Sequence, residues 1–276
     1  MYSSTSYSYP QHLLWCINNT NCKNDKSSYS FTHSLHITSK YVEWDYYAED
    51  EESMMHIPQQ ISHLTVVNNT CNEPTLQAVN LTGFDNLKKI NIGENTLGFV
   101  GSLQLDGLNN MTDLTFGGGS LGELTNFEIG NDTLSILASL DLSTFYNLTS
   151  FVAGSGALTG LSGFNTSHLA NLETFVVGNG SLIGAGSLSL GDSNHIHQVV
   201  LGNSAFANAT KFVIGQSSSL ESITVGDGCF TGEFEKGSGV AEDSFGFVIT
   251  GYDGLETIDL GSGSFSYFEE FEVSGR

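Results

Sequence analysis

Positive charge is scarce in this sequence. Its 276 residues include 8 Lys and Arg against 30 Asp and Glu, which gives a formal net charge of −22 at pH 7. A field of that sign repels nucleic-acid phosphates and anionic lipids, so we expect neither nucleic-acid binding nor polybasic attachment to membranes. The charge suits solubility and cationic partners.

Long apolar runs are also missing. No segment approaches the roughly 20 apolar residues that a membrane-spanning helix needs, so we expect no membrane insertion. Residues 1–19 lack the positive region and apolar core of a signal peptide. Nine N-x-S/T sequons are a mild indication of secretion, since chance alone gives several in a chain rich in Ser and Thr. They stand at Asn18, Asn68, Asn80, Asn110, Asn131, Asn147, Asn165, Asn179 and Asn208.

Cysteine and proline are few, whereas glycine is abundant. Four cysteines, Cys16, Cys22, Cys71 and Cys229, are too few for a disulfide-based fold. Cys16 and Cys22 can pair in an oxidising compartment, but free thiols explain them at least as well. The 32 Gly, with many Ser, Thr and Asn, favour turn-rich β structure over a helical bundle.

A repeat with a period of about 24 residues organises the chain. Segments of the form L-x-x-I-x-I-G begin at Leu87, Met111, Leu148, Leu172, Ile196, Leu220 and Leu255, and four of the steps between them have the same length. Apolar residues alternate in two short stretches of each unit, as strand residues do. The sequence therefore predicts a repeat solenoid, mainly β, whose stacked coils each contain two short strands and share one core.

Two steps depart from the period, and the period fades near the N-terminus. The step from Met111 to Leu148 contains an extra half-unit near 135–147, and the step from Leu220 to Leu255 contains a polar excursion near 231–243. We expect a solenoid over 57–276, behind a region 1–56 that is poorly ordered or caps the first coil, with 33–38 as a capping strand. The last coil has no apparent cap, which indicates a truncated chain, a partner or self-association there.

The units resemble the leucine-rich repeats of the BspA-like class, found on surfaces of bacteria and protists. The resemblance rests on segments such as "LESITVGDGCF" and "LETIDLGSGSF" and covers roughly residues 61–276. It implies recognition of a protein or glycan, commonly in adhesion, at the cell surface. The Pro that often ends the first strand of that class is absent and the second half of each unit is more strand-like, so a flatter β-solenoid or β-helix is the alternative to a horseshoe.

Three valines stand at an outward position of consecutive units. The outward column of the first strand reads Asn91, Thr115, Val152, Val176, Val200, Thr224 and Asp259. Stacked coils place such residues about 4.8 Å apart, so Val152, Val176 and Val200 form an apolar stripe, edged by Glu173, Thr174, His197 and Gln198. We expect this stripe to face a ligand. The simpler interpretation is that valine favours strands.

The remaining motifs favour structural roles. We expect the repeated glycines to turn tight corners rather than bind phosphate; they are Gly93, Gly117, Gly154, Gly178, Gly202, Gly226 and Gly261. His195 and His197 lack further ligands at a spacing suited to zinc. The acidic stretches 43–52 and 233–243 lack a calcium-loop pattern. We expect no cofactor and no metal site.

Ser and Thr are so common in the turns that a Ser among His and Asp residues does not identify a catalytic site, and basic residues are rare. The sequence therefore predicts a non-catalytic module that recognises a protein or glycan through an extended face. Two alternatives stay open: a polysaccharide-processing β-helix enzyme, and a purely structural surface solenoid. An ice-binding face is not expected, because no Thr-x-Thr ladder is present.

Overall fold

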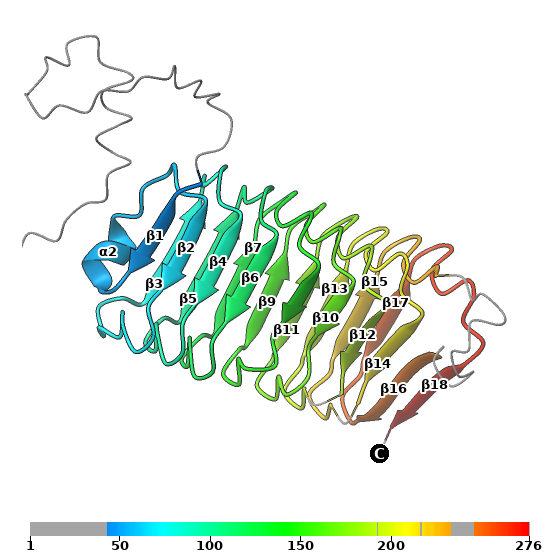
Figure 1. The fold of residues 1–276 in the computed structure, drawn as a ribbon. Coiled ribbons are helices and arrows are strands. Elements are labelled where there is room, and N and C mark those ends of the chain that lie inside the picture. The colour runs from blue at the N-terminus through cyan, green and yellow to red at the C-terminus, as the bar shows by residue number, and fades with distance from the viewer. Residues whose placement is uncertain (1–42, 192, 216, 233–245, 276) are drawn as a thin grey trace, which may run out of the picture. The chain divides into compact units, whose positions relative to one another are not determined.

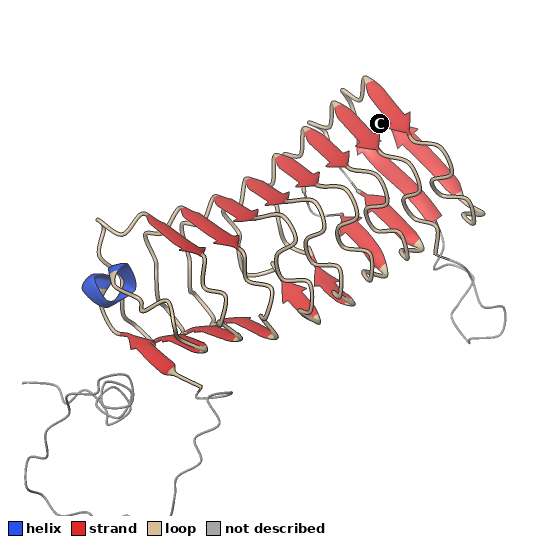
Figure 2. Ribbon diagram, turned by 90° about the horizontal axis from the view of Figure 1, so that it is seen from above, coloured by secondary structure: helices blue, strands red, loops and turns tan. Residues whose placement is uncertain are grey.

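The computed structural model describes residues 43–191, 193–215, 217–232 and 246–275, and within them the chain is a parallel β-solenoid. Short strands stack coil upon coil with parallel, in-register pairing (Figure 1). Figure 2 shows the strands in two rows on opposite sides of the solenoid, joined by loops. The predicted mainly β repeat solenoid with two short strands per coil is thus confirmed.

One row is a single eight-stranded sheet, called the long sheet below. Its paired residues follow one another at the repeat period from Ala78 through Ser102, Asn126 and Ser150 to Ser222 without interruption. Its strands, in spatial order, are β3 (Ala78–Thr82), β5 (Ser102–Asp106), β7 (Asn126–Ile129), β9 (Ser150–Ala153), β11 (Thr174–Val177), β13 (Gln198–Leu201), β15 (Ser222–Val225) and β17 (Thr257–Leu260).

The opposite row consists of three shorter sheets. The first contains β1 (Asp45–Ala48), β2 (His63–Val66), β4 (Lys89–Ile92) and β6 (Asp113–Phe116). The second pairs β8 (Ser139–Asp141) with β10 (Gly163–Asn165), and the third contains β12 (Ser187–Leu190), β14 (Lys211–Ile214), β16 (Gly246–Tyr252) and β18 (Phe271–Gly275).

The half-unit at 135–147 contributes one strand, β8, to the opposite row. Because of this extra half-coil, the strands formed by the L-x-x-I-x-I-G segments lie in different rows before and after it. Strands β4 and β6 lie in the opposite row, whereas β9 and all later ones lie in the long sheet. Strand β9 therefore pairs with β7, the second-half strand of an earlier unit. The polar excursion predicted near 231–243 lies mostly outside the described residues.

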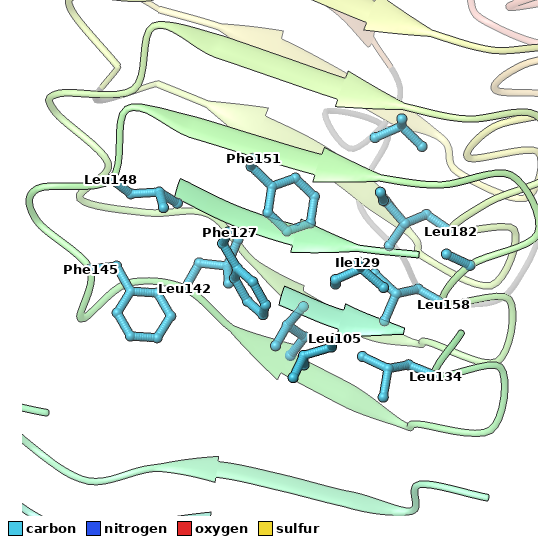
Figure 3. Packing of buried hydrophobic residues seen from close by; sticks show 14 of the residues in the cluster. Leu105, Phe127, Ile129, Leu134, Leu142, Phe145, Leu148, Phe151, Leu158 and Leu182 are labelled. Carbon is cyan, nitrogen blue, oxygen red and sulfur yellow. The ribbon is translucent and has the colours of Figure 1, made fainter. Parts of the chain in front are cut away.

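The core between the two rows is made of stacked leucines and phenylalanines. Phe127, Phe151 and Phe175 occupy one inward position in consecutive coils and are at most 1% exposed. The Phe151 and Phe175 rings stack with centroids 5.3 Å apart. Figure 3 shows Phe127 and Phe151 inside the solenoid, with Leu134, Leu158 and Leu182 in a second column. Each coil thus buries its apolar edge against the next.

The glycines at the predicted corners are explained by close approach of neighbouring coils. None of the seven has a positive φ. The expected reason for glycine at these corners, a turn conformation that strains other residues, therefore does not apply. A Cβ on Gly178 would instead lie 2.6 Å from the carbonyl carbon of Gly154, and one on Gly154 would lie 2.7 Å from that of Gly130. Glycine is required here because the backbone of the preceding coil occupies the side-chain space.

Buried apolar residues with left-handed backbone recur along the solenoid. Eight of them have φ between 51° and 59°, a region that bulky side chains rarely adopt. The conformation aligns the N–H of Leu182 with the Ala157 carbonyl at 3.0 Å and the N–H of Leu158 with the Thr133 carbonyl at 2.9 Å. The eight are Leu97, Leu121, Leu134, Leu158, Leu182, Phe206, Phe230 and Phe265.

The two ends of the solenoid differ. At the N-terminal end, β1 pairs with β2, and the helix α2 (Glu51–Met55) follows it and buries Met54. Strands β17 and β18 are the last of their sheets, and Phe271 and Val273 there are 53% and 46% exposed. Self-association at this end stays a prediction. Of the region expected to cap the fold, 1–42 including 33–38 lies outside the described residues.

Candidate recognition face

The outward column that holds the valines runs the whole length of the long sheet. Backbone pairing places Val152, Val176 and Val200 opposite one another in adjacent strands, as the sequence predicts. The predicted neighbours Asn91 and Thr115 lie instead in β4 and β6 of the opposite row, because of the extra half-coil. The observed column reads Asn80, Gln104, Glu128, Val152, Val176, Val200, Thr224 and Asp259.

The valine stripe is half-buried, and polar columns flank it. All three valines are of intermediate exposure. Thr174 pairs with Gln198 in the next outward column of the same two strands. Glu173 and His197 precede these residues, and His197 Nδ1 lies 3.4 Å from Glu221 Oε1 of the following coil. The predicted edge residues therefore lie together on two adjacent coils.

Beside this edge lies an open groove that sequence reasoning missed. It has a volume of about 600 Å³ and crosses four coils. Its lining residues are Glu123, Thr125, Asn147, Thr149, Asn171, Glu173 and His195. Four of them, Glu123, Asn147, Asn171 and His195, recur at the repeat period, so the column was visible in the sequence as periodic polar residues just before the strands.

The corner side chains of this groove are fixed by bonds to the preceding coil. Asn147 Nδ2 donates to the Gly122 carbonyl at 2.7 Å, and Asn171 Nδ2 donates to the Tyr146 carbonyl at 2.8 Å. His195 Nδ1 lies 2.9 Å from the Ala170 carbonyl, and because a carbonyl only accepts, Nδ1 is the donor. The same contact thus repeats along the column.

The two histidines considered for metal binding have separate partners. His195 lies at the corner and contacts a backbone carbonyl, whereas His197 contacts Glu221. Within the described residues, no three His, Cys, Asp or Glu side chains are placed to hold a metal ion together.

The acidic stretch 43–52 is engaged in structural contacts. Glu43 accepts from Lys88 at 2.8 Å, and this hydrogen bond holds the pKa of Glu43 below its ordinary value. Asp45 Oδ1 lies 2.6 Å from His63 Nδ1. Asp50 caps α2 by accepting from the Ser53 N–H at 2.8 Å, and the same bond lowers the pKa of Asp50. The other stretch, 233–243, lies outside the described residues.

The cysteines that the structure describes are part of the core. Cys71 and Cys229 are free and buried, and burial raises the pKa of both thiols. A raised pKa disfavours the thiolate that a nucleophile or metal ligand needs. Both thiols therefore have the properties of structural residues. Cys16 and Cys22 lie outside the described residues.

Comparisons with family models, curated proteins and solved structures found no match. In the described part of the chain, no helix has the length and apolar character needed to cross a membrane.

Proposed function

We propose that this solenoid is a non-catalytic recognition module that binds a protein or glycan partner along the outer face of the long sheet. The observation that carries the proposal is the in-register column of Val152, Val176 and Val200 with its polar edge. Partly exposed apolar residues bordered by polar ones are the usual composition of a binding surface. A rigid, regular sheet also binds without much loss of conformational freedom.

The repeat pattern supports a recognition role of the surface-adhesion type. The segment "LESITVGDGCF", which resembles BspA-like leucine-rich repeats, contains β15 of the long sheet. Proteins of that class present a repeated face to a partner, and here eight parallel strands provide such a face. The resemblance and the sequons together favour a location at the cell surface as part of this proposal.

The outer face of the long sheet is less suited to polysaccharide cleavage than to recognition. Sites of that type on β-helices combine carboxylates with Lys or Arg, whereas no strand of the long sheet contains a basic residue. The lysines that the structure describes are Lys88, Lys89 and Lys211, and they lie in or beside strands of the opposite row. We therefore place recognition ahead of catalysis.

A capture experiment with one substitution tests the proposal. Val176→Asp places a charge at the centre of the valine stripe, and we expect it to abolish capture of a partner from cell-surface extracts or on a glycan array. Ser189→Asp places the same charge at an exposed position of β12 in the opposite row and should leave capture unchanged. Circular dichroism and thermal melting verify that both variants keep the fold. Capture that survives Val176→Asp would refute the proposed face.

A further inference from the structure

The groove beside the valine stripe presents mainly hydrogen-bond acceptors. One N–H of Asn147 Nδ2 and one of Asn171 Nδ2 are bonded to carbonyls, so each amide presents its oxygen as an acceptor and one remaining N–H as a donor. With Nδ1 of His195 donating, Nε2 of the neutral ring accepts. Glu123 and Glu173 add two exposed carboxylates that have no hydrogen-bond partner within the described part of the chain.

The threonines of the groove add no free donors. Thr125 Oγ1 donates to the Gly101 carbonyl at 3.0 Å, and Thr149 Oγ1 donates to the Thr125 carbonyl at 3.1 Å. Acceptors therefore outnumber donors in the groove, and a complementary ligand must supply mainly donors. Hydroxyl groups do so without the desolvation cost of a charge. Anionic ligands are disfavoured by the two carboxylates and by the net charge of −22.

The spacing of the groove fits a linear polymer. Its corner residues come from four consecutive coils, so the polar column is roughly 14 Å long at about 4.8 Å per coil. Neighbouring coils are about 4.8 Å apart, a step comparable to the length of one pyranose ring in an extended, equatorially linked glycan. One sugar ring per coil would then meet one corner residue at each step, namely Glu123, Asn147, Asn171 and His195 in turn.

Two exposed aromatic residues occupy positions in or beside the polar column. Phe99 stands one repeat period before Glu123 in the same column and is 40% exposed. Tyr146, whose carbonyl accepts from Asn171, is 65% exposed. Flat rings with an apolar face are suitable surfaces for the C–H face of a sugar. The groove itself is lined by Glu, Asn, Thr and His residues alone, whereas the buried core of a protein–protein interface is more apolar.

We infer that the groove lined by Glu123, Asn147, Asn171, Glu173 and His195 binds an uncharged, unbranched glycan with an extended backbone, at one sugar per coil. The inference rests on the proposed function, because it identifies the partner class for the same face. The bonds that fix the two amides and the imidazole pre-organise the acceptors, so little conformational entropy is lost when the glycan binds.

Calorimetric titration of the full chain tests the inference. The probes are cello-, chito- and manno-tetraose, with maltotetraose as a bent chain and tetragalacturonate as an anionic one. We expect at least one extended tetraose to bind, its disaccharide to bind more weakly, and a hexaose to bind no better, since four coils form the groove. Glu173→Gln should weaken binding about tenfold, the cost of one hydrogen bond to a charged group.

Glu256→Gln is the matched control. Glu256 follows Glu173 and Glu221 in the same column, is exposed and lies outside the groove, so its substitution should leave affinity unchanged. Equal melting temperatures of the two variants exclude a general loss of fold. Binding that Glu173→Gln does not weaken, or a preference for tetragalacturonate, would overturn the inference.

The two proposals fail in different ways. If no extended tetraose binds while Val176→Asp still abolishes capture of a protein, the glycan inference is wrong and the proposed function stands. If Val176→Asp changes no capture and no tetraose binds, the proposed function itself is refuted.

Discussion

Gly178→Ala provides the sharpest test of how the coils are stacked. A Cβ at this position would lie 2.6 Å from the carbonyl carbon of Gly154 and 2.8 Å from Ser155 Cα. Both are backbone atoms of the preceding coil and cannot swing aside as a flexible side chain does. We therefore expect a loss of stability typical of overpacking, about 1–3 kcal/mol. The gain from a less flexible unfolded chain, about 0.4–1 kcal/mol, offsets part of it.

The assay is urea unfolding followed by far-ultraviolet circular dichroism. The urea concentration at the midpoint of unfolding should be lower for the variant, while the dependence of its unfolding free energy on urea concentration stays the same. Because solenoid coils contact only their neighbours, the loss should be local, so limited proteolysis should cut first between β9 and β11.

Gly186→Ala is the control for this prediction. Gly186 has no positive φ, and a Cβ there meets no atom within 4 Å. This substitution should be neutral or stabilising by up to about 1 kcal/mol. If Gly178→Ala is as stable as wild type, or if both variants lose the same amount, close approach of the coils is not the reason for the glycine column.

Two further predictions concern the core and the N-terminal cap. Phe175→Ala should cost about 3–5 kcal/mol in urea unfolding, because the ring is fully buried and stacks on Phe151, and Phe175→Leu should cost less. Asp50→Ala should destabilise α2 by up to about 1 kcal/mol through loss of its N-cap. Since the folded pKa of Asp50 is lowered, its stabilisation is present above the ordinary carboxyl pKa and is lost as pH falls through the folded value. Hydrogen exchange of α2 should therefore differ between Asp50→Ala and wild type at neutral pH but not in strong acid.

The sequence predicts the coils well and their pairing less well. The regular period and the alternation within it are sufficient to predict two strands per coil. Both halves of a unit carry the same apolar spacing, however, so the pattern alone does not decide which half stacks on which. The segment Leu124-x-x-Phe127-x-Ile129-Gly130, which lies one repeat period before Leu148, is the signal that assigns β7 and β9 to one sheet.

The left-handed leucines could not be predicted from local preferences. A bulky residue at φ near +55° is disfavoured by about 1–2 kcal/mol, so propensity argues against Leu182 in that conformation. Its hydrogen bond to Ala157 and the burial of its side chain, which offset the cost, exist only once the coils are stacked. The groove, too, exists only once the coils are stacked, because the hydrogen bonds that fix its corner side chains join residues about 25 positions apart.

The extra half-coil decides the composition of the proposed recognition face. It brings the polar second-half column of Asn80, Gln104 and Glu128 into register with the apolar first-half column that begins at Val152. Without it, the strict alternation of halves would place the valines in line with Asn91 and Thr115, on the other row of strands. One half-coil therefore joins polar and apolar columns within one sheet and leaves the core pattern unchanged. In a solenoid of this kind, a change of about half a period alters the outward surface of the sheet while the stacking that stabilises the fold is preserved.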